Sequence, residues 1–155
     1  MNRTHCIFAL SLLALAGCRK SPVFAASYLG AVTEQAHVEL DPSAAVPQSW
    51  DTNRPRGNVR VAVTPAGDRH FRVALPGCTV EIASDPEPNE HNAPLLLSPP
   101  QVCPVDVDHF RGSLAVTGNA VVDRANNTLR VTLTGANPQG SPFVRWTLTY
   151  DARPE

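Results

Sequence analysis

The chain has 155 residues, of which 43% are hydrophobic and 17% are charged, and its formal net charge is -1. This length fits one globular domain, because a domain usually takes about 100 to 200 residues. A nearly neutral chain whose arginines are scattered has no basic field to attract nucleic acid, which argues against nucleic-acid binding. Fifteen prolines argue against long helices, because proline removes a backbone donor and clashes with the preceding helical turn. The composition therefore favours a fold of strands and turns.

The N-terminal segment has the layout of a secretory signal. Arg3 gives it a positive start, residues 7–16 form an apolar centre, and small residues follow. The apolar run of residues 6–17 is too short to cross a bilayer as a helix, which takes about 20 residues. The segment is therefore interpreted as an export signal and not as a membrane span.

The signal ends in the sequence Leu15-Ala16-Gly17-Cys18. This motif resembles the lipobox of bacterial lipoproteins, in which a peptidase cuts just before a cysteine that carries lipid. The resemblance implies that Cys18 becomes the acylated first residue of the mature protein, and two or more acyl chains hold a protein stably at a membrane. The alternative is an ordinary secretory signal cleaved after Ala25, but that site lies well past the apolar centre.

The residues after Cys18 indicate at which membrane the protein is held. Arg19 and Lys20 follow Cys18, so the aspartate that often retains lipoproteins at the inner membrane is missing. In a two-membrane bacterium, the resemblance then favours the outer membrane, with the domain in the periplasm or outside the cell. The expected partners are the membrane, through the lipid, and an envelope protein or a surface polymer.

Three parts are expected along the chain. Residues 1–17 are the lipoprotein signal peptide, residues 18–27 form a lipidated tether, and residues 28–155 form a β domain. The domain is predicted to be all-β, either a small antiparallel β-sandwich or a closed meander barrel of about seven or eight strands. No repeat of 20 to 50 residues is visible in the sequence.

Two cysteines remain in the expected mature domain. Cys78 and Cys103 form an even pair in an oxidising compartment, where disulfides form and persist. We predict a disulfide between them, which would stabilise the domain by about 3 kcal/mol, chiefly by restricting the unfolded chain. A metal site would need further ligands at a suitable spacing, and the sequence has neither Cys-x-x-Cys nor His-x-x-x-His.

Apolar residues alternate with polar ones through most of the domain. Residues 28–40 are ambiguous between helical and strand spacing, and residues 41–57, with three prolines, are predicted to form a loop in which Trp50 covers an edge of the core. Later segments show the strand period and turn residues between them. The predicted strands include residues 59–63, 71–75, 80–82, 95–97, 105–107, 113–123, 128–134 and 143–150.

The inward faces follow from this alternation. Leu129, Val131 and Leu133 are predicted to face the core from one strand. Trp146 and Tyr150 are predicted to do so from the next, together with Val144 and Leu148.

Two groups of residues are weak candidates for chemistry. Asp85, Glu87, Glu90 and His91 could hold calcium or zinc, although their spacing matches no calcium loop and a solvated acidic loop explains them better. A second group comprises Asp106, Asp108 and His109. Two carboxylates can serve as acid and base, but charges that protect an exposed edge strand account for this group more simply.

The sequence contains no nucleophile elbow, phosphate loop, zinc-protease motif or dinucleotide glycine pattern. We therefore expect no enzyme activity, no catalytic residues and no cofactor. The expected function is that of a lipid-anchored envelope protein with a β-rich binding or structural module. The alternative is a carrier that encloses an apolar ligand in a small β-barrel.

Overall fold

The computed structural model describes residues 27–46, 48–67, 70–83, 95–96, 101–123, 128–137 and 141–155. In these residues the fold is all-β, as predicted, with nine strands and no helix. The strands are β1 (Ser27–Leu40), β2 (Gln48–Gly67), β3 (His70–Leu75), β4 (Cys78–Ala83), β5 (Leu95–Leu96), β6 (Gln101–Val107), β7 (Phe110–Asp123), β8 (Thr128–Asn137) and β9 (Phe143–Pro154).

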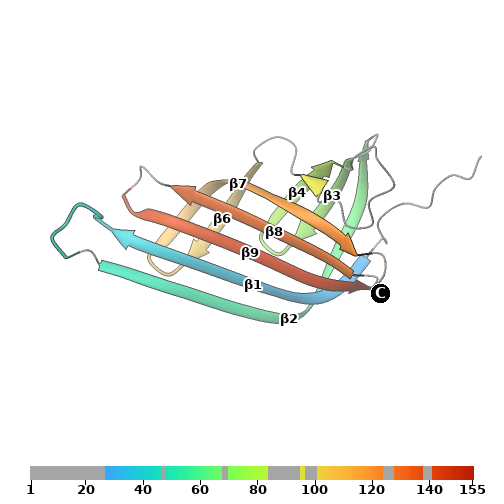
Figure 1. Ribbon diagram of the computed structural model, residues 1–155, viewed down its shortest axis with the longest axis horizontal. Coiled ribbons are helices and arrows are strands. Elements are labelled where there is room, and N and C mark those ends of the chain that lie inside the picture. The colour runs from blue at the N-terminus through green and yellow to red at the C-terminus, as the bar shows by residue number, and fades with distance from the viewer. Residues whose placement is uncertain are drawn as a thin grey trace, which may run out of the picture.

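All strand pairs are antiparallel, and they form one nearly closed, barrel-like sheet. Its order is β4-β3-β2-β1-β9-β8-β7-β5, and β6 pairs with the first part of β7. The long strands β2, β1, β9 and β8 form one layer with the part of β7 that pairs with β8, and β3, β4 and β6 lie behind it (Figure 1). The first and last described strands, β1 and β9, are neighbours at the centre of this layer.

The sheet is closed between β4 and β6 by side chains. Cys78 of β4 and Cys103 of β6 form the predicted disulfide, with their Cα atoms 5.2 Å apart. Beside it, the Gln101 side chain accepts a hydrogen bond from the Glu81 backbone N–H (2.8 Å) and donates one to the Glu81 backbone oxygen (2.7 Å). The Gln101 amide thus takes the place of a pair of backbone hydrogen bonds between β4 and β6. We call this junction of β4 and β6 the seam.

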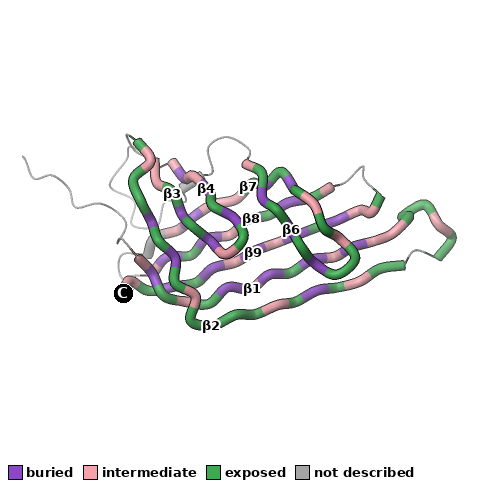
Figure 2. Tube along the Cα trace, turned by 180° about the vertical axis from the view of Figure 1, so that it is seen from behind, coloured by how far each residue is buried: buried purple, intermediate pink, exposed green. Residues whose placement is uncertain are grey.

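The core is made of the inward positions of the strands. Buried and exposed residues alternate along β3, β4 and β6, as Figure 2 shows from behind. The residues predicted to face inward on β8 and β9 are all buried, which confirms that register. They are Leu129, Val131, Leu133, Val144, Trp146, Leu148 and Tyr150. One buried cluster joins these residues to the apolar side chains of β1, β2, β3, β4, β6 and β7.

The loop predicted for residues 41–57 is wrong from Gln48 onward. There β2 begins, and it pairs with β1 from Gln48 to Arg56 despite Pro55. The reason is that β2 pairs with β3 only from Val63 onward, so its first part is an edge of the sheet, and edge strands tolerate proline. Residues 28–40, which were ambiguous, belong to strand β1.

A bulge bends the long strand β2. The register with β1 shifts between Gly30 and Val32, and Asn58 on β2 has a positive φ of 55°. Buried Tyr150 lies against this bulge, with its Oη 2.9 Å from the Tyr28 backbone oxygen and 3.1 Å from that of Val59. The bulge separates the flat first part of β2 from the second part, which pairs with β3.

Candidate functional site

Some of the residues predicted as sites lie within the described part of the chain, and others do not. Cys18 and the acidic group Asp85, Glu87, Glu90 and His91 lie outside the described residues. Within the described ranges, no group of three or more His, Cys, Asp or Glu side chains is arranged to hold a metal ion. The described part of the chain also contains no helix long and apolar enough to span a membrane.

The group Asp106, Asp108 and His109 lies at the turn between β6 and β7, and its carboxylates have separate partners. Asp106 binds Arg111, whereas Asp108 accepts a hydrogen bond from Arg54 of β2 at 2.8 Å. The His109 ring stacks on Trp50 of β2, with ring centroids 3.8 Å apart. The contacts of Arg54 and Trp50 fasten the hairpin to the edge of β2, so Asp108 and His109 have a structural explanation, and Trp50 covers this hairpin and not the buried core.

A polar surface covers the outer side of the layer formed by β7, β8, β9, β1 and β2. Strand register places its outward side chains in two adjacent rows, which we call the neutral rows. The first neutral row contains Thr117, Thr134, Thr147, Gln35 and Asn53. The second neutral row contains Asn119, Thr132, Thr149, Thr33 and Pro55. Nine of these ten side chains carry a hydroxyl or an amide, and none carries a charge.

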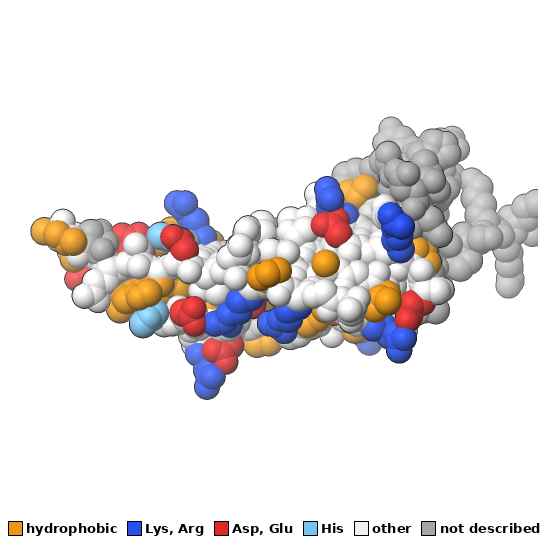
Figure 3. Space-filling view, turned by 90° about the horizontal axis from the view of Figure 1, so that it is seen from below, with side chains coloured by type: hydrophobic (Ala, Val, Ile, Leu, Met, Phe, Trp, Pro, Cys, Tyr) orange, Lys and Arg blue, Asp and Glu red, His pale blue; other side chains and the backbone are white. Residues whose placement is uncertain are grey.

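Charged side chains border the neutral rows on both sides, and most of them are paired with one another, whereas the Arg145 guanidinium lies over the Phe143 ring. On one side, His37 Nδ1 lies 2.9 Å from Asp51 Oδ1. On the other side, Arg130 binds Asp151, and this hydrogen bond raises the pKa of Arg130. Figure 3, which looks onto the molecule from the β2 side, likewise shows acidic and basic side chains next to one another in small groups. The neutral rows therefore lie between borders with little net charge.

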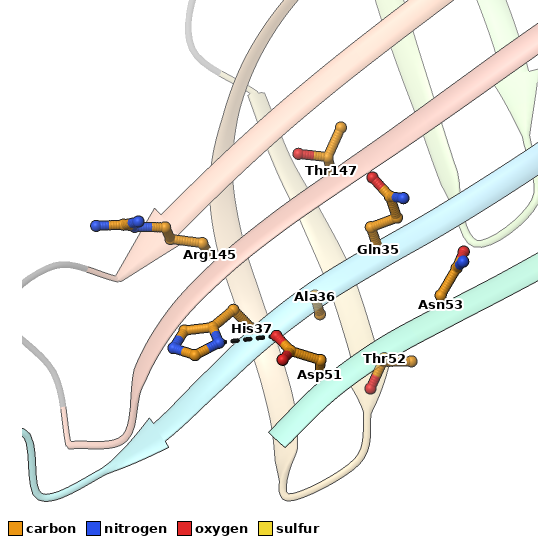
Figure 4. A pocket seen from close by; sticks show the side chains of 8 residues that line it. All are labelled: Gln35, Ala36, His37, Asp51, Thr52, Asn53, Arg145 and Thr147. Carbon is orange, nitrogen blue, oxygen red and sulfur yellow. Dashed lines mark hydrogen bonds and ion pairs between the residues drawn. The ribbon is translucent and has the colours of Figure 1, made fainter. Parts of the chain in front are cut away.

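A surface depression of about 350 Å³ lies where the first neutral row meets the His37 border. Its lining comes from three strands, and most of the polar side chains point outward from the sheet, whereas Ala36 and Thr52 are buried (Figure 4). The lining residues are Gln35, Ala36, His37, Asp51, Thr52, Asn53, Arg145 and Thr147. The Arg145 guanidinium lies over the Phe143 ring, 5.2 Å from its centroid, at the margin of this depression.

A second polar contact is buried on the inner side of the same strands. Trp146 Nε1 donates a hydrogen bond to Glu34 Oε1 at 2.9 Å, and both residues are less than 10% exposed. Arg56 lies 3.5 Å from the other carboxylate oxygen. The carboxylate is thus paired from two sides, and this arrangement accounts for a charge inside the sheet.

The sequence reasoning missed the outer surface. Its signal was present, because Thr132 and Thr134 on β8 and Thr147 and Thr149 on β9 repeat a hydroxyl at every second position. Such a repeat on outward positions predicts a hydroxyl surface only when the strands are known to be neighbours, and the sequence alone does not give that order.

Chemically, this surface offers hydrogen-bond donors and acceptors. Threonine hydroxyls and Asn or Gln amides can each both donate and accept. Together, the fold and the depression define a class, namely an all-β domain with a polar outer surface and a filled core. No family model, curated protein or solved structure matches this chain.

Proposed function

We propose that this protein is a lipid-anchored module of the bacterial cell envelope that binds a ligand through the outer depression beside His37 and Asp51. The depression is the observation that carries the binding part of the proposal. Its volume lies near the lower end of the range for ligand sites, about 300 to 1,000 Å³, and its lining offers a carboxylate, a guanidinium, an imidazole, two amides and two hydroxyls.

The anchoring part of the proposal rests on the motif that ends in Cys18. The disulfide between Cys78 and Cys103 supports it, because such bonds persist in exported proteins and are rare in the cytosol. The proposed place is the outer membrane, with the β domain in the periplasm or outside the cell. This position would present the depression to other envelope components.

The packing favours a binding module over a carrier of an apolar ligand. Inward side chains from β1, β2, β3, β4, β6, β7, β8 and β9 form one buried cluster, and many of them are fully buried. A barrel that carries an apolar ligand needs inward positions that leave room for it. Here those positions hold Leu, Val, Ile, Trp and Tyr side chains in mutual contact.

Anchoring is tested by metabolic labelling with a fatty-acid probe. The Cys18→Ser variant should lose the label and keep its signal peptide, whereas the matched Cys6→Ser variant should be labelled like the natural protein. Label retained at full strength on Cys18→Ser would overturn the anchor.

Binding is tested by photo-crosslinking in intact cells. A photoreactive amino acid at Gln35, inside the depression, should give a discrete adduct, and the same group at exposed Thr79 on β4 should not. Equal adducts from the two positions, or none from Gln35, would contradict a ligand site at the depression.

A further inference from the structure

We propose that the ligand of this surface is an uncharged glycan chain, which lies along the two neutral rows and enters the depression. The inference rests on the proposed function, since it names the ligand class of the same surface. It is carried by the regular placement of hydroxyl and amide groups on five neighbouring strands, between borders that each carry both acidic and basic side chains.

The geometry of the neutral rows is that of a repeating surface. Neighbouring strands lie about 4.8 Å apart, and outward residues along one strand lie about 6.6 Å apart. Thr134, Thr147 and Gln35 are consecutive across the first row, and Thr132, Thr149 and Thr33 are consecutive across the second. A ligand that repeats hydroxyl groups along its length can meet several of these positions at once, which a small compact ligand cannot do.

The rows contain no charged side chain and one apolar residue, Pro55, and this composition selects the class of ligand. Among the described residues, the large hydrophobic side chains that are exposed are Leu29, Val46 and Val102, and none of them belongs to the neutral rows. Protein interfaces usually have an apolar core, so a protein partner would find little to bury here. An anionic polymer lying along the rows would need cations there, whereas none of their ten side chains is charged.

The hydrogen-bonding capacity of the rows suits a polyol. Each hydroxyl of a sugar both donates and accepts, as do the hydroxyl and amide side chains that face it. Thr117 and Thr134 already lie within 3.3 Å of one another through their Oγ1 atoms, which shows that neighbouring hydroxyls of a row can exchange hydrogen bonds. At one end of the first row, Asn53 and Gln35 add amide groups next to the depression.

The test uses the full chain purified in detergent and measures retention on insoluble cellulose, chitin and mannan, with affinities for the soluble hexasaccharides of each by calorimetry. A triple variant, Thr134→Val, Thr147→Val and Thr149→Val, removes three hydroxyls while keeping branched side chains that suit a strand. The matched control is Thr79→Val, an exposed threonine on β4.

We expect the natural protein to bind at least one of these neutral glycans, with an affinity that is the same at low and high salt. The triple variant should bind it at least about tenfold more weakly, since each lost hydrogen bond costs about 0.5 to 1.5 kcal/mol. Thr79→Val should bind like the natural protein.

Three outcomes would overturn the inference. They are no binding to any of the three glycans, equal binding by the triple variant, and binding that salt abolishes. The photo-crosslinking result separates these failures from failure of the proposed function. A protein adduct at Gln35 without glycan binding would leave the proposed function standing and refute the glycan, whereas no adduct and no glycan binding would refute both.

Discussion

The buried phenol of Tyr150 makes the stability of the fold depend on pH. Burial raises the pKa of its phenol from 10.0 to about 12, and the phenol lies between two backbone oxygens at the β1–β2 bulge. Because the raised pKa belongs to a group that becomes an anion, the folded protein holds the proton more tightly than the unfolded chain does. The stability from this group is present below about pH 10 and falls as pH approaches about 12.

We therefore predict a loss of unfolding free energy between pH 10 and pH 12 that depends on Tyr150. Urea unfolding at pH 8, 10 and 11 should show this loss in the natural protein. Tyr150→Phe should be less stable at pH 8 and should show a smaller loss at high pH. A loss of the same size in both proteins would mean that another group is responsible.

At the scale of single residues, the sequence could predict which side chains face inward but not what the outward ones form together. Alternation identified Val131 and Trp146 as buried, because a strand exposes every second side chain to the same face. The neutral rows depend on which strands are neighbours and on their register. These are contacts between distant parts of the chain that no local pattern contains.

At the scale of strands, the register of β8 makes a direct prediction. Val131→Asp would bury a carboxylate in the apolar cluster, where Val131 is 0% exposed, and should lower the unfolding free energy by at least about 3 kcal/mol. Arg130→Gln changes the adjacent residue, which points outward and loses only an exposed ion pair with Asp151. That change should leave the unfolding free energy nearly unchanged, because exposed ion pairs contribute little. Urea unfolding of the two variants measures both values, and similar costs would contradict the register.

The seam between β4 and β6 gives a second prediction at this scale. Gln101→Leu would leave the Glu81 backbone N–H and oxygen without the side-chain amide that binds them. The Glu81 amide hydrogen should then exchange with solvent at least about tenfold faster, because a lost backbone partner costs about 1 to 3 kcal/mol. Hydrogen exchange followed by NMR measures this rate.

The matched control for the seam is Gln35→Leu, which changes an exposed glutamine on the outer surface. It should leave the exchange of the Glu81 amide unchanged. If Gln101→Leu also left that rate unchanged, the amide of Gln101 would not be holding the seam.

The strand boundaries show where local rules fail. The C-terminal strands were predicted closely because their apolar residues alternate without interruption. The first part of β2 was missed because Pro55 and the polar residues around it are typical of loops. Only the position of this segment at an edge of the sheet makes such residues compatible with a strand, and that position is a property of the whole fold.

For the molecule as a whole, the disulfide is the covalent link that closes the sheet between β4 and β6. Cys78 and Cys103 should resist alkylation in the unreduced protein and react together after reduction, since both are buried and bonded. Reduction should also lower the unfolding free energy by about 3 kcal/mol, as expected for a loop of this size. Peptide mapping and urea unfolding measure these two effects, and free thiols in protein recovered from cells would refute the bond.

The ends of the described domain lie side by side. Ser27 begins β1, and its backbone oxygen and hydroxyl both contact Glu155, which follows β9. The carboxylate of Glu155 also binds Arg60, and this hydrogen bond lowers the pKa of Glu155. A chain that enters the domain at Ser27 therefore joins it at one end of β1, and the depression lies farther along the same strand.

This placement has a mechanical consequence. If the tether and the depression are used as proposed, tension between the membrane and a polymer held in the depression enters at Ser27 and leaves near Gln35, about 26 Å away along β1. The pull then runs parallel to β1, and the hydrogen bonds that join β1 to β2 and β9 over this length share the load in shear. A pull across the strands would instead break such bonds one after another, so the domain is oriented to withstand force along the direction in which it would be stretched.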